Sequence, residues 1–199
     1  ALSIITATSA LYNLGKPLTL HKVGLIAHEA EVTMMTGLSD VVAELHGGGL
    51  IIRTRAGGPG VCELDTLPIR DSVRIIPCII KRGVTTPQIL KERWYEIRKI
   101  GKDIFKQFIR EPTFERFLEL SNKFSKAIFM DREIETKFNK LLYSYVKSGE
   151  VLTYFVKKGT LVVITSSTPK SELLDILRKN CIKLIGVLNI SSEGTVITI

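Results

Sequence analysis

Residues 27–60 read AHEAEVTMMTGLSDVVAELHGGGLIIRTRAGGPG and determine how the rest of the chain is interpreted. The stretch contains seven of the fifteen glycines and several carboxylates that cannot meet unless the chain turns between them. Thr36-Gly37-Leu38-Ser39 supplies residue types that favour a turn. We therefore expect one element before this turn and another after it to converge.

A helix is predicted over residues 19–35, before the turn. Thr19 is a good capping residue, and apolar residues follow it at mixed three- and four-residue spacing: Leu20, Val23, Leu25, Ile26, Ala30 and Met34. This spacing indicates a helix with a broad buried face.

Two carboxylates lie on either side of the turn. Glu31 shares one helical stripe with His28 and Met35, whereas Glu29 points about 100° away. Asp40 opens the apolar run that follows the turn. Two carboxylates so placed suit a divalent metal and a general base, but a Glu near a helix end and an Asp in a turn are also common solvated or capping residues. Spacing alone leaves both interpretations open.

The segments AHEAEV, TGLSDVVA and HGGGLIIRTRAGGPG together resemble the matching block of archaeal pantoate kinases. These enzymes belong to the superfamily of small-molecule kinases that includes homoserine, mevalonate and galactose kinases. The resemblance covers roughly the first 90 residues, including VTTPQIL at residues 84–90. Beyond that point it is one of layout only.

This resemblance implies ATP-dependent phosphorylation of the primary hydroxyl of pantoate to 4-phosphopantoate, on the route to coenzyme A, with ATP and Mg²⁺ as cofactors. It implies catalysis by Asp40 and Glu31, metal binding by Glu31, and substrate binding by His28, Arg53, Thr85 and Thr86. Asp40 would take or orient the hydroxyl proton. Glu29 is the competing metal ligand, disfavoured because it points away from the stripe of His28.

Several of these residues also have purely structural interpretations. Arg53 lies in a predicted strand over residues 50–55, between two glycine clusters that favour tight turns, and an exposed strand arginine is common. Thr86 is the expected cap of the next helix, with Pro87 at its first position. The residues alone therefore do not distinguish substrate binding from turn and cap formation.

Residues 1–15 predict a helix from the first residue onward, with no capping residue before it. In the kinase superfamily the corresponding helix follows a Gly- and Ser-rich loop that cradles the nucleotide phosphates. The resemblance thus predicts that this loop lies upstream of Ala1 and that the chain is the C-terminal two-thirds of such a kinase. We expect the 199-residue chain alone to be inactive, with an uncovered apolar helix face that favours self-association or a retained N-terminal fragment. A homodimer is among the expected partners.

Composition excludes several other classes of protein. The chain has 45% apolar residues, no apolar run long enough for a bilayer and no signal-peptide layout, so we expect a cytoplasmic location and no membrane partner. Its three cysteines form no CxxC pair and predict reduced thiols. The net charge of +8 resides largely in residues 87–147, where fourteen basic residues alternate with nine acidic ones; this pattern favours solvated helices over a nucleic-acid interface.

The overall pattern predicts an α+β fold of two-layer sandwiches, with antiparallel sheet and helices and a helix-rich middle. The expected domains are residues 1–60, the remainder of an N-terminal catalytic domain, and residues 61–199, a C-terminal α+β domain. After the strand at 50–55, we expect a strand at 73–80 with Pro77 at an edge or bulge, followed by helices over 87–147 that are interrupted at 111–113. Strands at 151–156 and 160–165 and a helix at 171–179 come next. The last expected elements are two strands within 182–199, joined at 192–194.

One segment departs from the family pattern. Residues 151–158 are bulky, where pantoate kinases commonly have small residues ending in glycine. This departure keeps two alternatives open: a kinase for another small hydroxy acid or polyol, and a non-catalytic binding module with the same fold. A substrate panel distinguishes the first, and metal-dependent ATP turnover the second.

Overall fold

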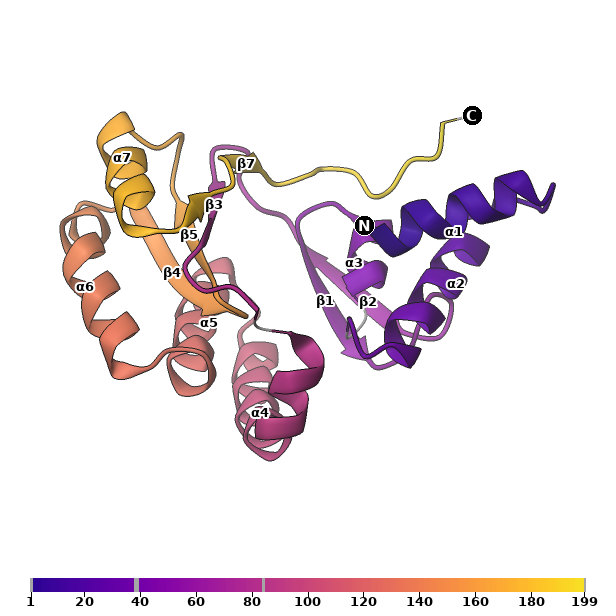
Figure 1. The fold of residues 1–199 in the computed structure, drawn as a ribbon, viewed down its shortest axis with the longest axis horizontal. Coiled ribbons are helices and arrows are strands. Elements are labelled where there is room, and N and C mark those ends of the chain that lie inside the picture. The colour runs from indigo at the N-terminus through magenta and orange to yellow at the C-terminus, as the bar shows by residue number, and fades with distance from the viewer. Residues whose placement is uncertain (1, 38–39, 84, 199) are drawn as a thin grey trace. The chain divides into compact units, whose positions relative to one another are not determined.

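The computed structural model describes residues 2–37, 40–83 and 85–198, and its ribbon is drawn in Figure 1. Helices combine with antiparallel strands, which confirms the predicted α+β class. The chain forms two compact units, Ala1–Pro68 with Ser191–Ile199, and Ile69–Ile190. These units differ from the predicted domain ranges, 1–60 and 61–199, because a strand after residue 60 pairs within the first unit and the last residues return to it.

The first unit packs two long helices against a short one and a two-stranded sheet. Its elements are α1 (Leu2–Asn13), α2 (Leu20–Thr33), α3 (Asp40–His46), β1 (Leu50–Arg55) and β2 (Glu63–Leu67). Buried apolar residues of the three helices form its core: Ile4, Ala7, Leu11, Val23, Ala27 and Val41. The predicted Thr19 cap is confirmed, since its side chain accepts a hydrogen bond from the Lys22 N–H at 3.2 Å.

Helix α2 ends two residues earlier than predicted. Met35 adopts a left-handed conformation with φ of 50°, although left-handed positions favour glycine. The Thr36 N–H bonds the Glu31 carbonyl at 3.0 Å, and the Met35 N–H bonds the Val32 carbonyl at 3.1 Å. This paired arrangement terminates the helix and turns the chain directly beyond Glu31. Leu38 and Ser39 of the predicted turn lie outside the described residues.

The second unit is a five-stranded antiparallel sheet with four helices. The elements are β3 (Arg74–Ile79), α4 (Thr86–Arg110), α5 (Phe114–Ile128), α6 (Arg132–Lys147), β4 (Val151–Lys157), β5 (Thr160–Thr165), α7 (Ser171–Asn180), β6 (Lys183–Leu184) and β7 (Leu188–Asn189). The strand order is β4-β5-β3-β6, with β7 also paired to β3. The predicted helix-rich middle and the interruption at residues 111–113 are confirmed.

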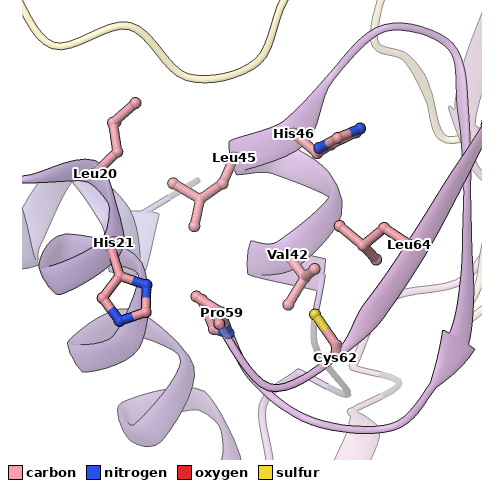
Figure 2. A pocket seen from close by; sticks show the side chains of 9 residues that line it. Leu20, His21, Val42, Leu45, His46, Pro59, Cys62 and Leu64 are labelled. Atoms are coloured by element: carbon pink, nitrogen blue, oxygen red, sulfur yellow. The ribbon is translucent and has the colours of Figure 1, made fainter.

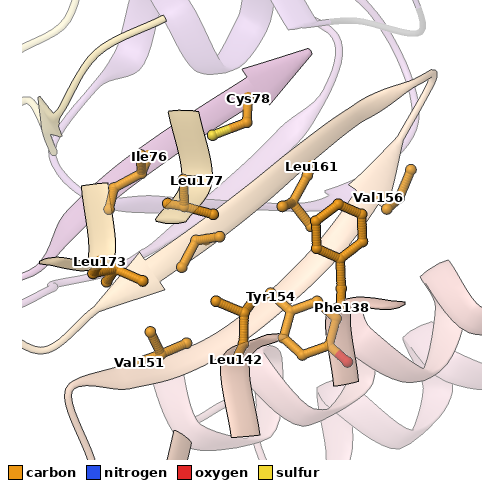
Figure 3. Packing of buried hydrophobic residues seen from close by; sticks show 11 residues of the cluster. Ile76, Cys78, Phe138, Leu142, Val151, Tyr154, Val156, Leu161, Leu173 and Leu177 are labelled. Atoms are coloured by element: carbon orange, nitrogen blue, oxygen red, sulfur yellow. The ribbon is translucent and has the colours of Figure 1, made fainter. Parts of the chain in front are cut away.

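Alternate residues of β5 enter two apolar clusters, one on each face of the sheet. Leu161 and Val163 belong to the larger cluster, where Phe138 and Leu142 of α6 and Leu173 and Leu177 of α7 are also buried (Figure 3). Val162 and Ile164 belong to the second cluster, with Leu118 of α5. Because successive side chains of a strand point to opposite faces, β5 contributes to the apolar packing on both faces of the sheet.

Helix α5 also covers the free edge of β4. The buried Ser125 hydroxyl donates to the Val156 carbonyl at 2.9 Å and accepts from the Val156 N–H at 2.6 Å, while the Asn122 amide donates to the Tyr154 carbonyl at 2.7 Å. Side chains thus replace a missing neighbouring strand, and the backbone of this edge is not free to pair with another chain.

Two predicted details of the second unit are wrong. Pro77 lies in the internal strand β3, opposite Val162 of β5, and not at a sheet edge. The other side of β3 meets two separate short strands, and Pro77 lies between their pairing positions, where a missing N–H breaks no ladder bond. The helix cap is Thr85 and not Thr86, because Thr85 and Gln88 form a capping box one residue earlier.

The predicted pair of strands joined at residues 192–194 is also wrong. Only two-residue strands form after α7, and residues 191–198 contain no strand. Instead, Thr195 hydrogen bonds to the backbone of Glu44 in the first unit. Alternating apolar residues suggested a hairpin, but the backbone of this segment hydrogen bonds to the end of α3.

The cysteines Cys62, Cys78 and Cys181 are free thiols, as predicted. Cys78 is buried, and its hydrogen bond to Cys181 together with burial raises the pKa of the Cys78 thiol. Over the ranges that the structure covers, no helix is both long enough and apolar enough to cross a bilayer.

The Ser125 bridge to β4 predicts a stability effect. Ser125→Ala leaves the buried Val156 N–H and carbonyl without partners, which should lower the free energy of unfolding by about 1–3 kcal/mol. Urea denaturation followed by circular dichroism measures it. The matched control is Ser144→Ala at an exposed position of α6, which should change stability by less than about 0.5 kcal/mol. Equal effects of both substitutions would contradict the bridge.

Candidate functional site

An open groove of about 630 Å³ runs along α1 and α2 to the face of α3. Small side chains line much of it, including Ala7 and Ala10 of α1 and Ala27 and Ala30 of α2. Its described polar lining consists of Ser3, Thr6, Glu31, Thr36, Asp40 and Glu44. The groove therefore combines an alanine-rich wall with carboxylates, and it brings Glu31 and Asp40 to one place.

Within the described residues, only one of the two carboxylate oxygens of Glu31 has a hydrogen-bond partner. The Ser3 hydroxyl donates to Glu31 Oε1 at 2.7 Å, which ties α1 to α2. Glu31 Oε2 is buried and has no hydrogen-bond partner within the described part of the chain. A buried carboxylate oxygen without a partner carries a desolvation cost unless a cation or donor compensates it. One oxygen of Glu31 is therefore available to a cation or a hydrogen-bond donor.

Gly37 makes room for this carboxylate. A Cβ added at residue 37 would lie 2.3 Å from Glu31 Oε2 and 2.9 Å from its Cδ, closer than real Cβ atoms approach such atoms. The close approach follows from the turn after α2, which returns the backbone over the Glu31 side chain. The sequence suggested Gly37 only as a helix stop, and its second role depends on a contact six residues away.

The charged side chains among the described residues that line the groove are all acidic. Glu31, Asp40 and Glu44 are all acidic, and none of the described residues that line the groove is basic. No cluster of three or more His, Cys, Asp or Glu able to hold a metal occurs among the described residues. A divalent ion bound here would thus draw further ligands from water or substrate, as Mg²⁺ does in sites shared with phosphates.

Sequence reasoning missed Ser3 and Glu44. Asp40 and Glu44 are four residues apart on α3 and so share one face, but residues 41–43 were interpreted only as an apolar run. Recognising α3 as a helix would have placed Glu44 beside Asp40. Ser3 offers no local indication, because its contact with Glu31 spans 28 residues.

His28 and Arg53 lie in the same unit but outside the residues that line this groove. His28 packs against the turn after β1: a Cβ at Gly58 would lie 2.4 Å from the His28 Cδ2. Arg53 is half-buried in β1, opposite Leu64 of β2 and on the other face of the strand from the buried Ile52. Their contact with a substrate stays a prediction.

Thr85 and Thr86 belong to the second compact unit. Thr85 is exposed and caps α4 through Gln88, whereas Thr86 is buried in the first turn. The capping role foreseen from the sequence is therefore filled by Thr85, and a role of either threonine in substrate binding is a separate prediction.

A second cavity, of about 250 Å³, lies near the start of α2, and Figure 2 shows the side chains that line it. Leu20, Val42, Leu45 and Leu64 give it an apolar character, with His21, His46 and Cys62 as its polar members. The His46 ring is engaged with the Thr66 hydroxyl at 3.1 Å. None of the predicted site residues lines this cavity, so the groove with Glu31 and Asp40 is the candidate site.

Comparison with known proteins confirms the resemblance seen in the sequence. The chain is 33% identical over 104 residues to the pantoate kinase of Thermococcus kodakarensis, and 32% identical over 101 residues to that of Methanocaldococcus jannaschii. These matches cover 51% and 50% of this chain but only 33% and 36% of the relatives. The matched part thus spans about a third of the length of either relative. No family model matches the chain.

Solved structures show the same fold. A phosphotransferase related to the coenzyme A biosynthesis pathway superposes with a TM-score of 0.71 at 24% identity, over 96% of this chain and 61% of that chain. A homoserine kinase from Cytophaga hutchinsonii superposes with a TM-score of 0.55 at 10% identity, over 95% of this chain and 64% of that chain. At these identities the likeness establishes the fold alone.

The contact between Gly37 and Glu31 can be tested by a double-mutant cycle. Gly37→Ala alone should lower the free energy of unfolding by about 0.5–1.5 kcal/mol, because the added methyl group displaces the Glu31 carboxylate from its hydrogen bond with Ser3. In a Glu31→Ala background the same substitution should cost little, since the crowded atoms are gone. Denaturant unfolding of the four proteins measures the coupling. Additive effects would show that Gly37 does not make room for this carboxylate.

Proposed function

We propose that this protein is an ATP-dependent kinase that phosphorylates the hydroxyl of pantoate. The observation that carries the proposal is the similarity to two pantoate kinases at 33% and 32% identity. The fold of small-molecule kinases and the acidic groove of the first unit support it. Because the matched part covers about a third of each relative, the activity is proposed for the protein and not for the isolated chain.

Glu31 would hold Mg²⁺ through Oε2, the buried oxygen that has no partner within the described residues. The ion, when bound with ATP, neutralises phosphate charge. Ser3 fixes the other oxygen of the carboxylate and so directs the free one. An acidic groove would otherwise repel a triphosphate, so a bridging cation is a physical requirement of this proposal.

Asp40 would accept or orient the proton of the substrate hydroxyl. Its position at the start of α3 places it on the groove that also contains Glu31. Phosphoryl transfer depends mainly on positioning and charge neutralisation, so a base fixed on a helix near the metal carboxylate suits the reaction. Because ATP is the donor, we also propose a cytoplasmic location for the reaction.

The acid end of the substrate would be held by His28, Arg53 and a threonine at 85 or 86. A guanidinium pairs with a carboxylate through two parallel hydrogen bonds, which suits Arg53 to this role. These assignments come from the resemblance. A change in substrate preference caused by substituting Arg53 would support them.

A homodimer is an additional proposal, motivated by the exposed Leu2, Ile5 and Tyr12 on α1.

Activity is tested by release of ADP from the full-length protein with Mg²⁺, ATP and a panel that includes pantoate, homoserine, shikimate and simple sugars. We expect a clear preference for pantoate and no turnover after chelation of the metal. Preference for another acceptor would reject pantoate as the substrate. Absence of metal-dependent turnover with every acceptor, from a folded protein, would reject the kinase assignment.

The catalytic role of Asp40 predicts a large loss of turnover. Asp40→Asn keeps the size of the side chain but removes its basicity, so kcat should fall by about 10²–10⁴-fold. KM for ATP should change little. Asp103→Asn is the matched control, because Asp103 is an exposed aspartate of α4 outside the groove lining. Near-normal turnover by Asp40→Asn would show that Asp40 is not the base.

A further inference from the structure

The C-terminal segment, residues 191–198, contacts helix α3. Both the N–H and the hydroxyl of Thr195 donate to the Glu44 carbonyl, at 3.0 and 2.9 Å. The last four carbonyls of a helix have no partner within the helix, and Glu44 is among them. Thr195 therefore acts as a C-terminal cap of α3, supplied by a residue 151 positions later in the chain.

The backbones of the two segments meet without intervening side chains. A Cβ at Gly194 would lie 2.0 Å from the Leu45 carbonyl oxygen, and a Cβ at Gly47 would lie 2.1 Å from the Glu193–Gly194 peptide. Gly47 also has φ of 63°, which closes α3. Glycine is therefore needed on both sides of this contact, and Thr195 reaches Glu44 only because both positions lack a side chain.

The segment also contributes to packing around α3. Ile197 packs against the apolar cluster that contains Val41 of α3 and Val23 of α2. Helix α3 has only seven residues, and a helix so short is marginal without tertiary support. Backbone capping by Thr195 and packing by Ile197 thus add to the packing of α3 against α2.

We propose that residues 191–198 position Asp40 by fixing α3, and that Thr195 is a positioning residue for the kinase reaction. This proposal rests on the proposed function in so far as it assigns Asp40 a catalytic role. Thr195 does not line the groove and acts through the helix that bears Asp40 and Glu44. Loosening α3 displaces the carboxylate that receives the substrate proton, while the Ser3–Glu31 contact between α1 and α2 is retained.

Thr195→Val removes the hydroxyl donor and keeps the backbone N–H. Gly194→Ala inserts a Cβ that forces the segment away from Leu45. We expect kcat of the full-length protein to fall by roughly 10-fold in the first variant and up to 100-fold in the second, with KM for ATP nearly unchanged. Thr195→Ser restores the hydroxyl and should recover most of the turnover. Val196→Thr is the control, because Val196 is a neighbouring residue that is 70% exposed.

Amide hydrogen exchange gives a readout independent of activity. Exchange at Glu44–Gly47 should accelerate at least about tenfold in Gly194→Ala, while amides of α2 stay protected. Unchanged exchange in α3, or a fall in kcat without faster exchange there, would overturn the proposal. If wild type lacks kinase activity, the proposed function fails, but the exchange experiment still decides whether the segment holds α3. Thr195→Val, the milder change, keeps the test valid if Gly194→Ala does not fold.

Discussion

The first unit is arranged around one partly buried carboxylate, that of Glu31. Glu31 reaches from α2 to the Ser3 hydroxyl of α1 and lies against the backbone of Gly37, so two helices and a turn are arranged around its two oxygens. One oxygen is satisfied, whereas the other is buried with no partner in the described chain. Such an arrangement costs folding free energy, and a protein retains it where the unpaired oxygen serves binding. The acidic groove follows from this carboxylate and from its neighbours on α3.

Local sequence patterns predicted most elements of the fold. Capping residues and apolar periodicity gave the start of α2, the strands β1 and β5, and the break before α5, because each of these depends on residues close together in sequence. The errors arose where distant parts decided the outcome. Alternation in the last residues favoured a hairpin, yet the carbonyl of Glu44 offered that segment a backbone partner far earlier in the chain.

The candidate site was predictable in part for the same reason. The local sequence predicts a turn between Glu31 and Asp40 and so made them candidates, the resemblance to pantoate kinases selected them, and both line one groove in the structure. The contact with Ser3 spans 28 residues and the contact with Thr195 spans 151, so no local pattern indicated either. Glu44 was missed for a different reason: a three-residue apolar run does not by itself distinguish a strand from the middle of a short helix.

The bulky segment at residues 151–158 has a structural explanation that bears on function. Val151, Thr153, Tyr154 and Val156 are buried in β4, and α5 covers the outer edge of that strand. Large side chains there fill the core of the second unit, so their presence is no evidence that catalysis has been lost. The non-catalytic alternative then has to account for the groove of the first unit, where a buried carboxylate oxygen has no hydrogen-bond partner within the described residues. In the proposed kinase, Glu31 would hold a cation through this oxygen, and the ion would compensate its charge and lower the repulsion between an acidic groove and a nucleotide.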